Sequence, residues 1–325
     1  VLGHMNMEHI YRRNTTNDRE YSIQCIQQMD EAYPEKLRFY KGMPKEIYLL
    51  GKLPDPGKPT VAIVGARRSS SYGNEAARFF AGELAKAGVQ ISGMAWGIDG
   101  MAHMGALEAG GYTCAVLGCG VDICYPQGHR TLYEAIRKTG GILSEFSPGI
   151  PPKPGHFPAR NRIISGLSVL VLVVEAKEKS GSLITADFAL EQGKDVYAVP
   201  GRIGDALSVG CLGLIRQGAG LADSPQTILS ALGISEKCKK KDTKILLAKD
   251  ENIVYSWIRL QPVSLDELIQ KTGWSVPKLM AVLVGLELKG CIREVRKNDY
   301  VRTDLRITNG EISGDSGVTC KGEDN

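Results

Sequence analysis

The sequence predicts an α/β protein in which a Rossmann-like, doubly wound and mostly parallel sheet is followed by a small C-terminal winged-helix domain. The first observation is an alternation of short apolar runs and helical patterns from Thr60 to about Gly233. The apolar runs lack period-two alternation, as is typical of parallel strands buried on both faces. Helical patterns of this length between strands indicate right-handed βαβ crossovers. The second observation is a change of character after residue 245, where three helical patterns precede a hairpin pattern.

The large domain is expected to cover residues 58–233, with strands and helices in strict alternation. We expect strands over 60–65, 89–93, 113–118, 142–146, 169–176 and 195–201. The helical patterns between them cover 74–88, 98–111, 129–141, 160–168 and 184–193. In an open sheet of this kind, ligands bind outside the carboxyl ends of the strands.

The segments outside the two domains carry little periodic pattern. Residues 1–57 form an N-terminal extension, in which VLGHM resembles an expression-tag scar and short candidate elements lie at 21–30 and 46–51. The stretch LPDPGKP then interrupts regular structure. We expect a lysine-rich linker over 234–244 and a disordered polar tail over 304–325.

The C-terminal domain, over residues 245–303, is predicted to be a winged helix-turn-helix. Its second helix has Ser264 as N-cap, Glu267 three residues later as in a capping box, and Gly273 as the stop. The third helix, the usual groove reader, is almost entirely apolar, and Lys278 and Lys289 are its only cations. Because base reading needs Arg, Asn or Gln along one face, we expect this helix to pack inside its own domain or against a partner.

Composition places the chain among ordinary soluble proteins. It has 325 residues, 43% of them hydrophobic, and a net charge of only +4, so a nucleic-acid surface would have to be a local patch. None of its 8 cysteines forms a CxxC pair, which favours reduced thiols in a cytoplasmic protein over a zinc site. The longest apolar runs are too short to span a bilayer. We therefore expect no metal, no cofactor and no membrane partner.

The loop after the first strand is a candidate anion site. Gly65 ends the strand, Arg67 and Arg68 add two positive charges, and Ser70 contributes a hydroxyl close to a helix start. Free backbone N–H groups at a helix N-terminus favour an anion there. The dinucleotide pattern GxGxxG is absent, which argues against a nicotinamide or flavin cofactor.

The stretch from Gly149 to Arg162 is predicted to be a stiff, extended loop that binds single-stranded nucleic acid. It is rich in proline and carries several cations, one aromatic ring and no carboxylate. Cations can meet phosphates there while an exposed base stacks on the ring. The alternative is that the ring anchors the loop on the sheet and that Arg162 pairs with a carboxylate elsewhere. The residues concerned are Lys153, Phe157, Arg160, Asn161 and Arg162.

A second loop of small residues follows the strand that ends near Glu175. Gly181 and Ser182 precede a helix and make another potential anion site, although no P-loop pattern is present. Glu175 and Glu191 leave a nucleotide hydrolase or a nucleotide sensor open as an alternative. A third possibility is a winged-helix regulator that senses a small ligand through its large domain.

These motifs, in this order, resemble those of the DNA-processing protein DprA (Smf) family. The resemblance covers roughly residues 20–305 and is carried by VAIVGARRSSSYG, SGMAWGIDGMAHMGALEAGG, VLGCGVDICYP, ILSEF, HFPARNRIISGLS, VVEAKEKSGSLITADFALEQGKDVYAVPG and GCLGLIRQGA. It implies a cytosolic, non-enzymatic protein that binds single-stranded DNA, protects it during natural transformation and recombination, and helps to load the RecA recombinase. It also implies a homodimer formed through the Rossmann-like domain.

The resemblance also implies a set of DNA-binding residues. Arg67, Lys153 and Phe157 would form the pocket, and Arg160, Asn161 and Arg162 would shape it. Backbone and hydroxyl contacts to phosphate would come from Gly65, Ser70, Gly181 and Ser182. Two departures stand out: Leu212 replaces an asparagine that many members have after GC, and the helical N-terminal domain of many members is missing or much reduced.

Overall fold

The computed structural model describes residues 22–93, 95–234, 247–259 and 261–302. The chain divides into two compact units, Val1–Asp242 and Thr243–Asn325, each of which is treated by itself below. The expected disordered tail at 304–325, and the expected linker apart from Ile234, lie outside the described residues.

The first unit is built on one nine-stranded sheet with the strand order β1-β2-β6-β5-β4-β3-β7-β8-β9. All neighbours from β6 to β9 in that order are parallel, which confirms the mostly parallel α/β fold. The strands are β1 (Gln24–Gln27), β2 (Glu46–Gly51), β3 (Thr60–Val64), β4 (Gln90–Gly93), β5 (Thr113–Leu117), β6 (Gly141–Ser144), β7 (Leu170–Val173), β8 (Asp195–Ala198) and β9 (Gly220–Leu221).

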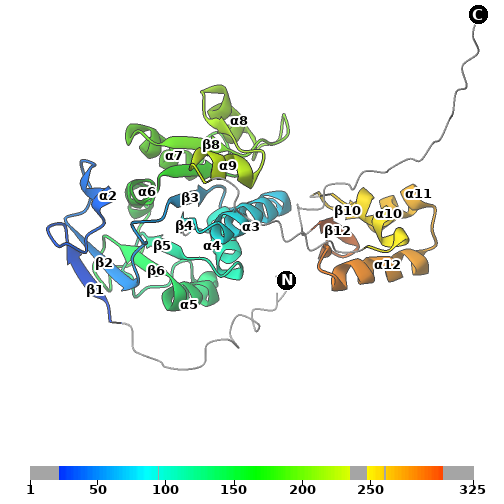
Figure 1. Ribbon diagram of the computed structural model, residues 1–325, viewed down its shortest axis with the longest axis horizontal. Helices are drawn as coiled ribbons and strands as arrows, with labels where there is room; N and C mark the ends of the chain where they lie inside the picture. The colour runs from blue at the N-terminus through cyan, green and yellow to red at the C-terminus, as the bar shows by residue number, and fades with distance from the viewer. Residues whose placement is uncertain (1–21, 94, 235–246, 260, 303–325) are drawn as a thin grey trace, which may run out of the picture. The chain divides into compact units, whose positions relative to one another are not determined.

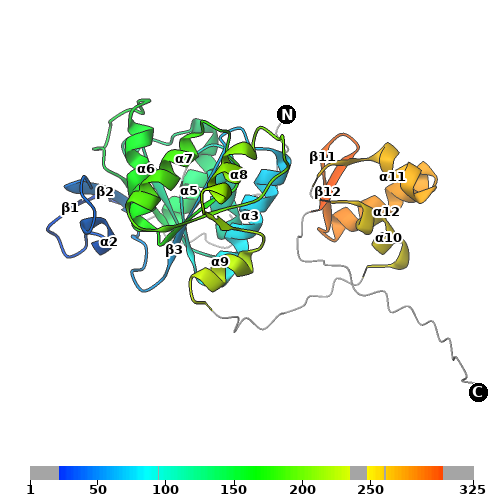
Figure 2. The ribbon, with the colours of Figure 1, turned by 90° about the horizontal axis from the view of Figure 1, so that it is seen from above.

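Helices cover both faces of this sheet, so the doubly wound arrangement is confirmed (Figures 1 and 2). One face of the sheet is covered by helices α2, α6, α7 and α8, and the other face by helices α3, α4, α5 and α9. Their bounds are α2 (Glu35–Arg38), α3 (Ser71–Lys86), α4 (Ile98–Glu108), the 3-10 turn η1 (Gln127–His129), α5 (Arg130–Thr139), α6 (His156–Leu167), α7 (Gly181–Glu191), α8 (Val209–Arg216) and α9 (Pro225–Ala231).

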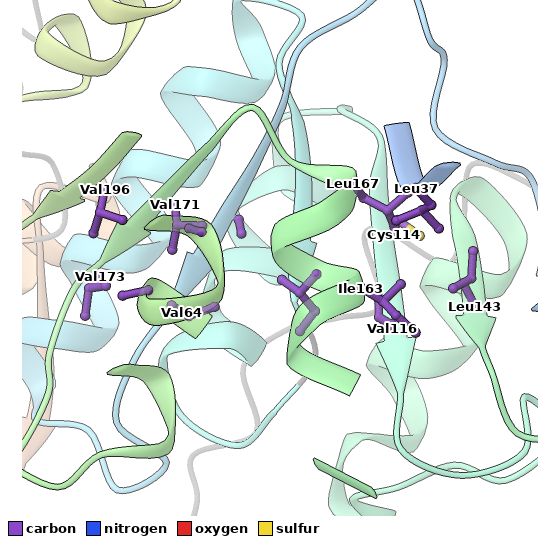
Figure 3. Packing of buried hydrophobic residues seen from close by; sticks show 14 of the residues in the cluster. Leu37, Val64, Cys114, Val116, Leu143, Ile163, Leu167, Val171, Val173 and Val196 are labelled. Carbon is purple, nitrogen blue, oxygen red and sulfur yellow. The ribbon is translucent and has the colours of Figure 1, made fainter. Parts of the chain in front are cut away.

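The core follows from the apolar character of the parallel strands. In β3, Val61 and Ile63 pack against one helical layer, while Ala62 and Val64 pack against the other. Ile163 of α6 lies against this second face, in the cluster that Figure 3 shows. Full burial of such a side chain contributes about 1.5–3 kcal/mol, so the face that α6 presents to the sheet fixes the helix in place.

The N-terminal segment belongs to the same sheet, which corrects the boundary expected at residue 57. β1 pairs antiparallel with β2, and β2 pairs antiparallel with β6, with Leu49 opposite Leu143. Ile47 and Leu49 are buried on one face and Leu50 on the other. A strand buried on both faces cannot leave the core without exposing this surface, so residues 24–51 are part of the large unit rather than an irregular extension.

The stretch predicted as an extended loop up to Arg162 becomes a helix earlier than expected. Helix α6 begins at His156, so Phe157 and Pro158 lie in its first turn. Proline is tolerated there because the first N–H groups of a helix have no intrahelical acceptor. The extended part of the loop therefore ends before His156.

The second unit is the predicted winged helix. Its helices are α10 (Lys249–Trp257), α11 (Leu265–Thr272) and α12 (Val276–Leu288), and its sheet, in the order β10-β12-β11, contains β10 (Val263–Ser264), β11 (Ile292–Arg296) and β12 (Asp299–Arg302). As expected, the Ser264 side chain accepts a hydrogen bond from Glu267 N at 3.2 Å, and Gly273 ends α11 in the left-handed region at φ 68°.

Helix α12 was expected to pack inside its own domain or against a partner, and only part of its apolar surface is buried in its own domain. Leu279, Leu283 and Leu286 are buried in the core of the winged helix, as an apolar third helix requires. Val284 and Leu288, however, are 48% and 85% exposed within this unit. The helix thus combines a packed face with an apolar exposed one.

Two further features of the described residues are the hydropathy of their helices and the state of their cysteines. No helix among them combines the length and hydropathy needed to cross a membrane. Cysteines 114, 119, 124, 211 and 291 are free and buried, and burial raises the pKa of the Cys114 and Cys211 thiols to about 12. These two thiols therefore stay protonated and unreactive at neutral pH.

Candidate nucleic-acid interface

The loops that follow the parallel strands gather at one edge of the sheet, where the carboxyl ends of the strands lie. Strand β3 is flanked by β4 and β7, and the chain reverses its direction of travel through the sheet between β3 and β7. Such a switch point is where open α/β sheets bind ligands. The loop after β3 carries Arg67 and Ser70, and the loop after β7 carries Glu175 and leads to Gly181.

Ser70 and Glu175 join these two loops. The Glu175 carboxylate accepts hydrogen bonds from Ser70 N at 2.9 Å and from the Ser70 hydroxyl. The same hydroxyl oxygen accepts from Gly73 N at 3.0 Å and thereby caps α3. A Cβ on Gly73 would lie 2.3 Å from the Glu175 carboxylate, so glycine is needed for this approach. Ser70 was expected to contact phosphate, but its N–H and its hydroxyl are used inside the protein.

An aromatic and basic cluster lies beside this junction. The guanidinium carbon of Arg67 is 5.3 Å from the centroid of the Phe157 ring. Phe157 also packs against Tyr125, with ring centroids 5.4 Å apart and planes inclined by 35°. Arg67 is exposed, Tyr125 is 39% exposed and Phe157 is half-buried. We call these three residues the Arg67–Phe157–Tyr125 cluster.

Neighbouring residues within the protein fix the position of Phe157. His156 stacks on Phe146 with centroids 3.9 Å apart, and its Nδ1 lies 3.0 Å from the carbonyl oxygen of Gly118. A Cβ on Gly118 would come within 3.1 Å of the Phe157 ring. The ring is thus seated against the loop after β5, and its orientation does not depend on a ligand.

Arg160, Asn161 and Arg162 do not lie on the open surface that the sequence suggested. Arg160 is 3% exposed and donates a hydrogen bond to the carbonyl oxygen of Val116. Burial lowers the pKa of the Arg160 guanidinium to about 10, and the charge of Asp99 opposes this shift. Arg160 and Asn161 are among the buried residues of α6, and Arg162 is half-buried.

The partners of Asn161 and Arg162 show what these residues do instead. Asn161 Nδ2 donates to the carbonyl oxygen of Gly181 at 3.2 Å and so ties α6 to the start of α7. Arg162 pairs with Glu145 at 2.5 Å. The pairing of Arg162 with a carboxylate was the alternative weighed from the sequence, and the structure shows it. The three residues support the cluster rather than extend it.

The other predicted site residues divide into exposed and buried ones. Arg68, Lys153 and Gly181 are exposed at the carboxyl edge. Ser182 is buried and its hydroxyl lies 2.8 Å from that of Ser180. Gly65 is also buried, and a Cβ there would lie 2.6 Å from the Ile98 side chain. Gly65 therefore serves close packing, not an open phosphate contact.

Tyr125 is the functional candidate that sequence reasoning missed. It stands in the loop after β5, beside Pro126, where an exposed aromatic has no role in the core. Its position after a buried parallel strand was a usable signal, since that loop must reach the same sheet edge as the loops of Arg67 and Lys153.

The fold and the cluster together define a Rossmann-like protein with a candidate nucleic-acid interface and an appended winged helix. A family model described as DNA recombination-mediator protein A matches residues 24–233, and one described as DprA winged helix domain matches residues 239–296. The chain therefore belongs to the DNA recombination-mediator protein A (DprA) family, and the resemblance seen in its motifs is confirmed.

Individual relatives agree with this assignment. The chain is 39% identical over 282 residues to Protein Smf of Escherichia coli, a match that covers 84% of this chain and 75% of the relative. It is 45% identical over 202 residues to DNA processing protein DprA of Streptococcus pneumoniae, covering 62% of this chain and 72% of the relative.

Two solved structures share the fold. The X-ray structure of DprA from Streptococcus pneumoniae matches with a TM-score of 0.61 and 41% identity, covering 65% of this chain and 74% of that one. A structure from Helicobacter pylori, described as giving insights into the single-stranded DNA binding mode of DNA processing protein A, matches with a TM-score of 0.58 and 30% identity. That match covers 66% of this chain and 96% of that one.

Proposed function

We propose that this protein binds single-stranded DNA at the carboxyl edge of its sheet and does not cut it. The observation that carries the proposal is the Arg67–Phe157–Tyr125 cluster, in which an exposed cation lies over one ring and a second ring is partly open. The description of the Helicobacter pylori relative as a single-stranded DNA binder supports it.

The chemistry of the cluster suits an unpaired strand. Arg67 and the exposed Lys153 can neutralise phosphates, while a base stacks on the accessible part of the aromatic pair. Stacking contributes about 1–3 kcal/mol per base, and it needs the face of the base to be free. A duplex keeps its bases stacked on one another, so we expect the strand to bind more tightly than the duplex.

Neither of the two carboxylates that could serve the alternative hydrolase is free beside the small-residue loop. Glu175 is 5% exposed and is occupied by Ser70. Glu191 ends α7 and is exposed, whereas the small-residue loop lies at the other end of that 11-residue helix. At a rise of about 1.5 Å per residue, the two ends are separated by roughly 15 Å. These placements favour binding over hydrolysis.

Membership of the DprA family supports a proposal for the finer role. We propose that the protein acts in the cytoplasm, protects the bound strand and helps to load RecA during natural transformation or recombination. Measuring RecA filament formation on strands covered by single-strand-binding protein, with and without this protein, tests that role. Faster filament formation supports it, and an unchanged rate contradicts it.

We further propose a homodimer formed through the large unit. Leu221 of the edge strand β9 is 48% exposed, which leaves an apolar side chain open at this edge of the sheet. An exposed apolar edge of a sheet is suited to pairing with a second copy. Leu221→Glu should shift the sedimenting species from dimer to monomer, and an unchanged dimer would place the interface elsewhere.

The DNA-binding proposal is tested by fluorescence anisotropy of labelled oligo-dT with Arg67→Glu. A matched control is Arg216→Glu, an equal charge reversal at the exposed C-terminal end of α8. In parallel α/β units this helix end lies at the amino edge of the sheet, away from the cluster. We expect Arg67→Glu to lose binding and Arg216→Glu to retain it. Equal effects of the two variants would show that only overall charge matters.

A further inference from the structure

Trp96 is a large aromatic residue that the cluster described above does not include. It stands in the loop between β4 and α4, at the same carboxyl edge, and 42% of its surface is exposed. A single exposed apolar residue needs no explanation by itself. Its surroundings, however, hold this ring in one place.

Gly128 and His129 pack directly against the Trp96 ring. The ring centroid lies 4.4 Å from that of His129, with the planes at 61°. A Cβ on Gly128 would come within 2.4 Å of the indole, so the turn η1 lies directly against it. Gly97, the next residue in the chain, has φ 74°, which favours glycine, and a Cβ there would lie 2.2 Å from the carbonyl oxygen of Ala66.

These contacts place Trp96 next to both ends of the cluster. A Cβ on Gly97 would also lie 2.7 Å from the carbonyl oxygen of Arg67, so the Trp96 loop abuts the backbone of the Arg67 loop. His129 and Gly128 follow Tyr125 by only a few residues in the loop that carries it. Trp96 is therefore bounded by the segments that position Arg67 and Tyr125.

Positive charge accompanies the ring. Arg130 begins α5 directly after His129, and its side chain is 70% exposed. Its contact with Glu134 is a surface pair at 3.4 Å, which a phosphate can replace at little cost. Arg68, in the loop that Gly97 abuts, is also exposed. A seated aromatic ring with flanking cations is the arrangement that single strands use for stacking.

We propose that Trp96 is a second base-stacking platform, which takes a base of the same single strand next to the Arg67–Phe157–Tyr125 cluster. This inference rests on the proposed function, because it extends one DNA path along the sheet edge. It assigns to Trp96 and Arg130 a base contact and a phosphate contact that the motifs of the chain did not suggest.

The experiment uses the emission of Trp96 itself. The chain has 3 tryptophans, and the other two, Trp257 and Trp274, lie in the winged helix. In the full-length variant with Trp257→Phe and Trp274→Phe, unlabelled oligo-dT is titrated while tryptophan emission is followed. Stacking of thymine on the indole should quench the emission with the same midpoint as anisotropy of the labelled strand. Normal strand binding with unchanged emission would overturn this inference alone.

A second arm measures affinity. Trp96→Leu keeps an apolar side chain but removes the stacking surface, and should weaken oligo-dT binding by about 5- to 150-fold. Trp96→Phe keeps an aromatic ring and should therefore retain most of the affinity for oligo-dT. Equal affinities of Trp96→Leu and the unaltered protein, with Arg67→Glu still deficient, would overturn the platform but leave the proposed function standing. No strand binding by the unaltered protein would overturn both.

Discussion

The Glu175 carboxylate accepts two hydrogen bonds from Ser70, one from its backbone N–H at 2.9 Å and one from its hydroxyl. This contact joins the loop after β3 to the loop after β7 across the switch point of the sheet. It is reinforced by a hydrogen bond from Ala66 N to the Glu175 carbonyl oxygen at 2.7 Å. The residue that follows Ala66 is Arg67, so this junction sets the position of the cation in the cluster.

The first prediction concerns this junction. Glu175→Ala removes a buried acceptor from two donors, and hydrogen bonds to a charged group contribute about 1.5–3 kcal/mol each. We expect the free energy of unfolding of the large unit to fall by roughly 3 kcal/mol. Urea titration followed by Trp96 emission, in the variant with Trp257→Phe and Trp274→Phe, measures it. If Glu175→Ala and Ser70→Ala have fully additive effects, the contact is not coupled and the interpretation is wrong.

The second prediction separates stacking from charge. Phe157→Leu should weaken oligo-dT binding by about 5- to 150-fold without altering the dependence of affinity on salt, because the ring carries no charge. Arg67→Ala should instead reduce the slope of log affinity against log salt by about 0.7, the value for one phosphate contact on a single strand. Anisotropy across a salt series measures both. A changed slope for Phe157→Leu would contradict the assigned roles.

The third prediction concerns the buried arginine. Arg160→Met removes the donor to Val116 and the positive charge near Asp99. Breaking a buried charged network typically costs about 3–5 kcal/mol, so the large unit should be strongly destabilised. Under conditions where the variant is still folded, its salt slope for oligo-dT should equal that of the unaltered protein. A reduced slope would mean that Arg160 contacts phosphate after all.

The fourth prediction is a pH dependence of stability. His103 is fully buried, and burial, with the charges of His129 and Arg160, lowers its pKa from 6.5 to about 3. Between these values the unfolded chain binds a proton that the folded protein does not. The contribution of neutral His103 to the free energy of unfolding is therefore fully present above pH 6.5. It falls as the pH drops towards 3, by at most about 1.4 kcal/mol per pH unit. Unfolding free energies at pH 7.5 and pH 5, compared between His103→Gln and the unaltered protein, should show a smaller loss in the variant. Equal losses would contradict the assignment.

Much of the fold could be predicted because parallel strands buried on both faces leave unbroken apolar runs in the sequence. The same reasoning located short elements at 21–30 and 46–51 but missed their place in the sheet, because β2 pairs antiparallel with β6, which lies far along the chain. It did find the caps Ser264 and Gly273, since these depend on local backbone geometry. Local signals were reliable, and pairing over long sequence distances was not.

The candidate site shows the same division. Arg67, Lys153 and Phe157 follow glycine-ended or proline-rich stretches, so their exposure at the sheet edge was predictable. The internal contacts of Arg160 and Arg162 were not predictable, because their partners are Val116 on β5 and Glu145 after β6. The stretch from Gly149 to Arg162 was therefore interpreted as a basic surface, although two of its three cations, Arg160 and Arg162, have partners inside the protein.

The most direct test of the central claim is to locate the bound strand on the protein. An oligo-dT containing 5-bromouracil is crosslinked by irradiation to the full-length protein, and the attached peptides are identified by mass spectrometry. We predict attachment at Phe157 or Tyr125, with loss of both crosslinks in Arg67→Glu. Crosslinks confined to the winged helix, at Trp257, Trp274 or Tyr300, would contradict the claim that the carboxyl edge of the large sheet binds single-stranded DNA.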